Sequence, residues 1–157
     1  MRRHGPARLV AVFVTAAMSL VGAAVLAAPA DAAACPTETG VSVIVDFNGL
    51  GGGVQGTCES DGGGKSASTL FAQAGFPLTY AQRQPGFVCR VSGVPTSDPC
   101  VNTSPANAFW ALWWSDGKSG RWTYSTLGAS SLTIPDGGYV GFSFDDVDGQ
   151  APPSTTP

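Results

Sequence analysis

The N-terminal segment determines how much of the chain is left to fold and in which compartment it folds. Three arginines occur within the first eight residues, an apolar run continues to Leu26, and small residues fill positions 27–34. This pattern is typical of a secretory signal with A-x-A cleavage sites, which leave a mature start at Ala33 or Cys35. We therefore predict that residues 1–34 are a signal peptide and that the mature protein is secreted or displayed at the cell surface.

Two alternatives remain open for this segment. The apolar run approaches the length of a membrane-spanning helix, and Cys35 is in a position to carry a lipid after cleavage. The alanine-rich cleavage sites directly after the run favour the signal peptide, and Ala32 stands where a lipidation motif has a leucine-like residue. After cleavage we expect no membrane span.

Four cysteines, Cys35, Cys58, Cys89 and Cys100, all follow the predicted signal. An even number in an exported chain indicates a disulfide framework, for which four cysteines allow three pairings. We favour Cys35–Cys58 with Cys89–Cys100, because cysteines adjacent in the sequence close short loops around turn-rich segments. A four-cysteine zinc site usually has C-x2-C spacing. That spacing is absent here, so no metal site is predicted.

Removal of the signal leaves an acidic chain without histidine. The full sequence has 8 basic and 11 acidic residues, and the signal takes Arg2, Arg3, Arg8 and Asp31, which leaves 5 and 10. Nucleic-acid binding is therefore excluded, because it requires phosphate-neutralising Lys and Arg. The single histidine, His4, is also in the signal, so no histidine can activate a nucleophile. The carboxylates show no pairing of the kind a glycosidase needs, and we predict no enzymatic activity, no catalytic residue and no resident cofactor.

The mature sequence is dominated by short predicted strands joined by glycine-rich turns. Residues 41–47 alternate and are β-branched, which favours a half-buried strand. Ser66–Ala74 is the one clear helix, with a serine to cap its start and Gly75 after its end. Further strands are expected at 54–58, 78–82, 87–91, 108–115, 121–126 and 139–144.

These elements predict an α+β domain at residues 35–149, with a sheet of five to seven strands and one helix packed on one face. The last segment, residues 150–157 (QAPPSTTP), is rich in Pro, Ser and Thr. Such a composition cannot build a core, so we expect an extended tail or linker there.

The segment 108–115, AFWALWWS, is the strongest local feature of the sequence. In a strand, Trp110 and Trp114 point to one side while Phe109 and Trp113 point to the other. Both sides are apolar, although a sheet with one helix has only one well-covered face. We predict that Phe109 and Trp113 face the helix as core, and that Trp110 and Trp114 form an exposed aromatic face.

A ligand site is the functional interpretation of such a face, because exposed apolar patches mark ligand or partner sites. Trp122 and Tyr124, across the hairpin turn, would extend it. The predicted ligand-binding residues are therefore Trp110, Trp114, Trp122 and Tyr124. In the alternative interpretation both sides of the strand are buried, and the chain is a structural or adhesive surface protein without a small-molecule ligand.

Four segments carry a resemblance to a known family: Gly64–Phe76, Gly86–Pro95, Ala108–Gly128 and Ile134–Asp145. In these segments, and in Val45–Val54, the chain resembles the transcobalamin-like C-terminal domain of secreted and surface bacterial proteins, including actinobacterial ones. The resemblance implies a β-grasp-like fold and a surface binding role. It also implies contact with one face of a cobalamin, beside a vitamin or cobalt uptake transporter. The predicted function is an extracellular module that binds a small molecule, with a corrinoid-like ligand among the candidates.

Overall fold

The computed structural model describes Met1, residues 34–146 and residues 150–157. The predicted signal peptide therefore lies outside the described residues, except for Met1 and Ala34. Among the residues that are described, no helix is long and apolar enough to cross a membrane.

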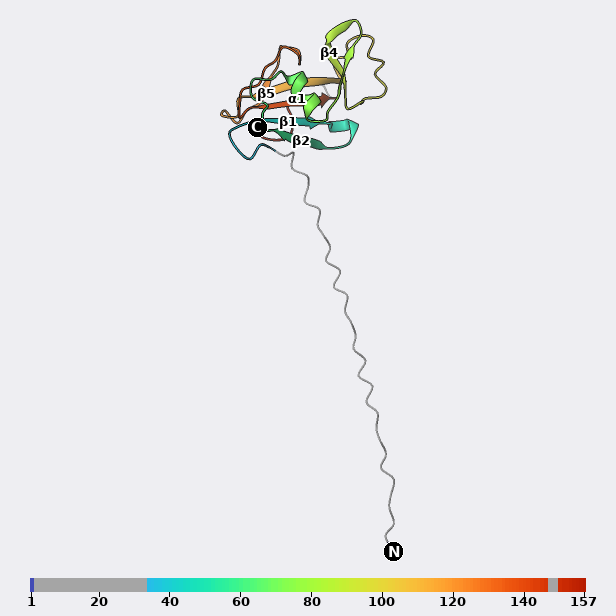
Figure 1. Ribbon diagram of the computed structural model, residues 1–157. Coiled ribbons are helices and arrows are strands. Elements are labelled where there is room, and N and C mark those ends of the chain that lie inside the picture. Colours follow the sequence, from blue (N-terminus) through green and yellow to red (C-terminus); the bar gives the residue numbers. More distant parts are fainter. Residues whose placement is uncertain (2–33, 147–149) are drawn as a thin grey trace.

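The described part of the chain is mostly sheet, with one α-helix and one short 3-10 helix (Figure 1). The first strand pair precedes the helix, and the remaining strands follow it. In chain order the elements are β1 (Val41–Asp46), η1 (Asn48–Leu50), β2 (Val54–Glu59), α1 (Ala67–Gln73), β3 (Leu78–Ala81), β4 (Gln84–Val91), β5 (Phe109–Ser115), β6 (Thr123–Tyr124) and β7 (Tyr139–Asp145).

Five strands form one mixed sheet in the order β2-β1-β7-β5-β6, and β3 pairs with β4 in a separate two-stranded sheet. The first and last strands, β1 and β7, are parallel neighbours at the centre, while the flanking pairs are antiparallel. A hairpin, a helix and a final central strand parallel to the first make this a β-grasp-like sheet. The predicted α+β fold is confirmed.

The helix packs on one side of the five-stranded sheet, which we call the helix face. Leu70 and Phe71 of α1 are fully buried, and the rings of Phe71 and Phe142 lie 4.8 Å apart. Ser66 caps the helix as predicted, because its Oγ accepts from the Thr69 N–H at 3.3 Å. The sheet residues of this core are Val41, Val43, Val45, Trp110, Leu112, Val140, Phe142 and Phe144.

Both predicted disulfides are present. Cys35–Cys58 ties the segment before β1 to β2, and Cys89–Cys100 ties β4 to the long connection before β5. No cysteine of the described residues is free. The framework therefore fixes one edge of the large sheet and the small hairpin beside it.

The orientation predicted for β5 is wrong. Trp110 is 4% exposed and faces the helix, in the same core as Phe144, which lies opposite it on β7. Trp114 packs against this core as well, whereas Trp113 lies on the other side and meets Tyr124 edge-to-face at 5.3 Å. The aromatic side chains of β5 alternate between the two sides as expected. However, Trp110 and Leu112 lie opposite Phe144 and Phe142 of β7, so Trp110, and not Trp113, belongs to the core.

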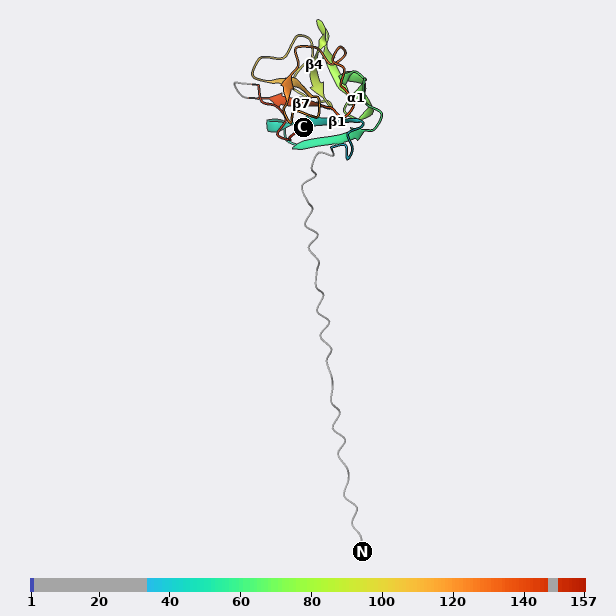
Figure 2. The ribbon, with the colours of Figure 1, turned by 90° about the vertical axis from the view of Figure 1, so that its left-hand side faces the viewer.

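Part of the segment 150–157 packs on the domain. Residues 153–155 lie on the side of the sheet opposite α1, which we call the tail face, and Pro153 is buried there. The C-terminus accordingly lies against the body in both ribbon views (Figures 1 and 2). A proline ring next to a glycine of the sheet packs without needing a regular element, although the composition of the segment predicted an extended tail or linker.

Candidate functional site

The pocket that includes part of the aromatic strand lies between β4, β5 and residues 124–129. Its volume is about 300 Å³, and aromatic residues from several strands line it. Phe87 comes from β4, Phe109 and Trp110 come from β5, and Phe142 comes from β7. We call this pocket, with its neighbour described below, the β4–β5 groove.

A tight turn shapes the side of the groove formed by residues 124–129. The Ser125 N–H donates to the Leu112 carbonyl at 2.8 Å, which anchors the turn to β5. The Ser125 hydroxyl accepts from the Leu127 N–H at 3.1 Å and donates to the Leu127 carbonyl at 2.9 Å. A Cβ on Gly128 would lie 3.0 Å from the Gly86 carbonyl, so the turn meets the β3–β4 hairpin here. This contact closes the groove on one side.

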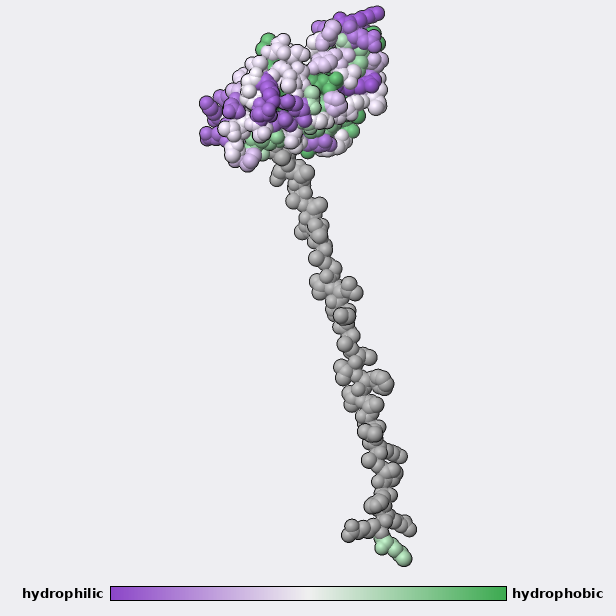
Figure 3. All heavy atoms as spheres, viewed as in Figure 1, coloured by the Kyte–Doolittle hydropathy of each residue, from purple (hydrophilic) through white to green (hydrophobic). Residues whose placement is uncertain are grey.

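Two exposed apolar residues line the 300 Å³ pocket. Leu127 is 52% exposed, and Tyr124 is 36% exposed with its ring packed on Trp113. Apart from Met1, they are the exposed large hydrophobic residues among those described. Elsewhere, hydrophilic residues cover much of the face seen in Figure 3, with small hydrophobic patches between them. Exposed apolar groups gathered at one pocket indicate a binding surface.

A second, more open pocket of about 730 Å³ continues the groove. It shares Gln84, Phe87 and Phe109 with the first pocket and extends to Thr103 and Ser104. The first pocket is lined by neutral residues throughout. The first pocket therefore suits an uncharged aromatic or apolar group, whereas the second pocket is lined in part by Asp145, with amide and hydroxyl groups beside it.

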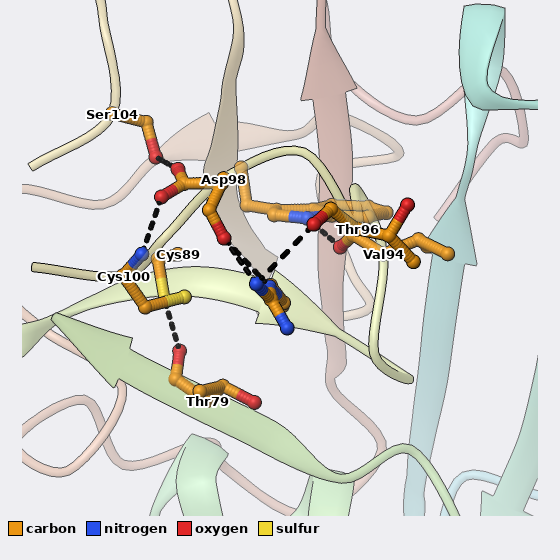
Figure 4. The surroundings of a disulfide bond; sticks show 9 residues. Thr79, Cys89, Val94, Thr96, Asp98, Cys100 and Ser104 are labelled. Atoms are coloured by element: carbon orange, nitrogen blue, oxygen red, sulfur yellow. Dashed lines mark hydrogen bonds between the residues drawn. A yellow bond between two sulfur atoms is a disulfide. The ribbon is translucent and has the colours of Figure 1, made fainter.

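The disulfide-tied connection before β5 holds Trp110 in place. The Trp110 indole N–H donates to the Val94 carbonyl at 2.9 Å. Asp98 accepts from the Cys100 N–H and from the Ser104 hydroxyl, which folds the loop around the Cys89–Cys100 bridge (Figure 4). Trp110 is thus a fixed wall of the pocket rather than an open stacking platform.

The Arg90 guanidinium reinforces this loop from β4. It donates to the Asp98 carbonyl through both Nε and Nη2, and through Nη2 to the Thr96 carbonyl at 3.4 Å. The arginine thereby satisfies backbone acceptors of the loop in a region where water has limited access. Its role in the described structure is to order the groove wall.

The structure divides the four predicted ligand-binding residues. Trp110 and Tyr124 line the groove. Trp114 packs against the helix-face core, and Trp122 lies on the tail face, where its ring meets Tyr139 at 6.2 Å. The predicted single row therefore does not form, because Trp110 and Trp122 lie on opposite faces.

Two residues that the sequence analysis did not select belong to the groove. Phe87 was placed in a strand but without a functional role, and Leu127 was not singled out at all. Leu127 did leave a signal: it is a large apolar residue in the short polar stretch STLG. A leucine in such a turn has no strand partner to cover it, which is consistent with its exposure.

Another pocket, of about 690 Å³, brings three carboxylates to one region: Glu38, Asp116 and Asp136. Two of these carboxylates accept hydrogen bonds from backbone N–H groups. Asp136 accepts from the Gly40 N–H at 2.7 Å, and hydrogen bonds from the Lys118 N–H and the next N–H lower the pKa of Asp116. A general acid needs a raised pKa, so Asp116 does not suit that role. No cluster that could hold a metal ion occurs among the described residues.

Comparison with known proteins provides no family for this chain, since no family model, curated protein or solved structure matches it. The two disulfides and the lack of a membrane-spanning helix among the described residues are compatible with an extracellular protein.

Proposed function

We propose that the chain is an extracellular or cell-surface binding module that holds a small uncharged aromatic or apolar group in the β4–β5 groove. The observation that carries the proposal is the position of Leu127. This side chain is 52% exposed at the rim of an aromatic-lined pocket. Exposing it to water has a cost that a ligand would remove.

The dimensions of the groove limit the ligand. Small-molecule sites commonly have volumes of about 300–1,000 Å³, and the smaller pocket here is at the lower end, about 300 Å³. A ligand of one or two rings fits this part. A corrinoid, which the family resemblance suggests, would insert only an edge or a substituent, with the rest of the macrocycle over the wider pocket beside Phe109.

Export supports the same proposal. The signal-peptide pattern at residues 1–34 and the two disulfides suit an oxidising exterior. An exported module with an aromatic-lined groove suits a binding role, and a link to an uptake transporter is part of the proposal. A structural or adhesive role without a small ligand is the competing hypothesis.

The test uses the chain exported and purified from the culture medium, titrated with the neutral fluorescent probe N-phenyl-1-naphthylamine. We expect saturable binding. Leu127→Asp should raise the dissociation constant about tenfold, because one leucine contact is worth about 1.5 kcal/mol. Trp122→Phe is the matched control on the other face and should leave the affinity unchanged.

Cyanocobalamin is then added as a competitor. Displacement of the probe supports a corrinoid ligand, while undisturbed probe binding points to a smaller aromatic ligand. If the probe fails to bind, or binds Leu127→Asp as tightly as the unaltered chain, the groove is not the site and the structural role is favoured.

A further inference from the structure

A second groove lies on the tail face, opposite the helix, and residues of the chain itself fill it. Its floor is Gly141 of β7, where a Cβ would lie 2.8 Å from Pro153 Cγ and 3.2 Å from Trp122 Cη2. The missing side chain thus makes room for a proline ring beside an indole. Tyr139 stands perpendicular to Trp122, with interplanar angle 88°, and extends this aromatic wall.

Polar contacts fix the residue that follows the proline. The Ser154 N–H and hydroxyl both donate to Asp46 Oδ2, at 2.9 and 2.7 Å. Asp46 is 3% exposed, and its other oxygen accepts from the Asn48 N–H at 3.2 Å. Because an isolated buried carboxylate is costly, hydrogen-bond donors at this position contribute strongly to binding.

A third contact is made to the backbone of the next residue, Thr155. The Trp122 indole N–H donates to the Thr155 carbonyl at 2.7 Å. A proline held in an aromatic groove, with an indole N–H directed to a nearby carbonyl, is the chemistry by which proteins recognise extended proline-containing peptides. The contacts define a short motif: proline, then serine or threonine, then any residue.

The fit of the chain's own segment is incomplete. Thr155 Oγ1 is buried without a hydrogen-bond partner among the described residues. Unpaired buried polar groups reduce the stability of a contact. A segment with a different third residue, or one that approaches along a slightly different line, can therefore bind the same groove at least as well.

We propose that the tail-face groove, formed by Asp46, Trp122, Tyr139 and Gly141, is a binding site for a proline-containing, Ser/Thr-rich segment of another polypeptide chain. Residues Pro153–Thr155 occupy it as an intramolecular ligand. The site is distinct from the β4–β5 groove and goes beyond the function proposed above. Because the tethered segment has a high effective concentration, an outside segment competes when it is itself present at high local concentration.

The experiment measures binding of the labelled peptide QAPPSTTP to the exported chain and to its Ser154→Ala variant. Fluorescence anisotropy reports the peptide, and the Trp122 indole 1H–15N signal reports occupancy of the groove. Ser154→Ala removes one of the tail's two bonds to Asp46 and leaves the sheet intact. We expect this variant to bind the peptide roughly tenfold more tightly than the unaltered chain, because the competing tail is weakened by about one hydrogen bond.

The specificity controls use the same assay. The peptide QAAAATTP, in which alanine replaces the two adjacent prolines and the serine, should bind at least about tenfold more weakly. Trp122→Phe combined with Ser154→Ala should show a similar loss, because the indole donor is absent. Light scattering adds a second readout: a dimer that QAPPSTTP dissociates supports the proposal, because the tail of a second copy then occupies the groove.

One result would overturn the proposal. In Ser154→Ala the Trp122 signal moves to the position of an exposed indole, and the peptide at millimolar concentration does not move it back. The groove would then bind only the segment that is covalently attached to it. Equal binding of QAPPSTTP and QAAAATTP would overturn it as well. Neither result affects the β4–β5 groove, because the naphthylamine titration is independent of Trp122.

Discussion

The two faces of the central sheet are covered in different ways. On the helix face, Leu70 and Phe71 of α1 pack on Phe142 and its neighbours through apolar contacts. On the tail face, a segment without regular structure is held by hydrogen bonds to Asp46 and Trp122. Apolar burial tolerates many exchanges of similar volume, whereas directional bonds to a buried carboxylate do not. The helix face therefore tolerates exchanges of similar volume, whereas the tail face requires a segment that can donate to Asp46.

The largest expected effect tests the helix face. Trp110→Ala removes an indole that is 4% exposed and contacts Phe144 at a centroid distance of 5.3 Å. We expect the free energy of unfolding to fall by about 3–5 kcal/mol, as for other large core truncations. Urea denaturation measures it. Trp122→Ala, on the tail face, is the matched control and should cost clearly less. If the two variants lose the same free energy of unfolding, both faces of the sheet contribute equally to stability.

Gly141→Ala tests the tail face alone, with a smaller effect. The added methyl would stand 2.8 Å from Pro153 and 3.2 Å from Trp122, so the tail has to move. We expect a loss of about 1–3 kcal/mol, as for overpacked sites, and a shift of the Trp122 indole signal. Far-UV circular dichroism should be unchanged. A variant with an unchanged indole signal would show that the tail adapts without leaving the groove.

Much of the fold could be predicted from local sequence. The alternation Val41, Val43, Val45 identified the core side of β1, Ser66 marked the helix start, and the cysteine spacing indicated both bridges. The alternation in β1 and the helix cap each depend on a few neighbouring residues, and each disulfide joins two cysteines that are adjacent in the cysteine order. Local periodicity is sufficient for such features.

The faces of β5 could not be assigned in the same way. AFWALWWS is apolar on both sides, so its orientation depends on the partner strand, in which Phe144 opposes Trp110 and Gly141 opposes Trp113. For this reason the predicted exposed row of Trp110, Trp114 and Trp122 does not form. Two signals for the covered tail face were nevertheless present: Asp46 within an apolar strand, which requires donors, and Gly141 within another, which indicates a close approach.

The smallest expected effect concerns the turn that connects β5 with Trp122 of the tail face. Residues 116–120 lead from β5 to Trp122 on the tail face, and the Asp116 carboxylate accepts from the N–H groups of Lys118 and Ser119 at 2.9 and 3.0 Å. These bonds hold the pKa of Asp116 below its usual range, with the Lys118 N–H the largest cause. A lowered pKa in the folded state means that the stabilisation is present above the unfolded pKa and is lost as pH falls through the folded pKa.

We therefore expect the Trp122 indole signal of the unaltered chain to stay constant from neutral pH down to the usual aspartate range and to change below it. In Asp116→Ala that acid step should be missing from the signal at Trp122. Asp61→Asn is the matched control: Lys65, 2.9 Å away, lowers the pKa of this carboxyl too, but it lies on the β2–α1 connection. If Asp61→Asn also removes the acid step at Trp122, the step comes from overall charge, and the Asp116 turn does not position the tail-face tryptophan.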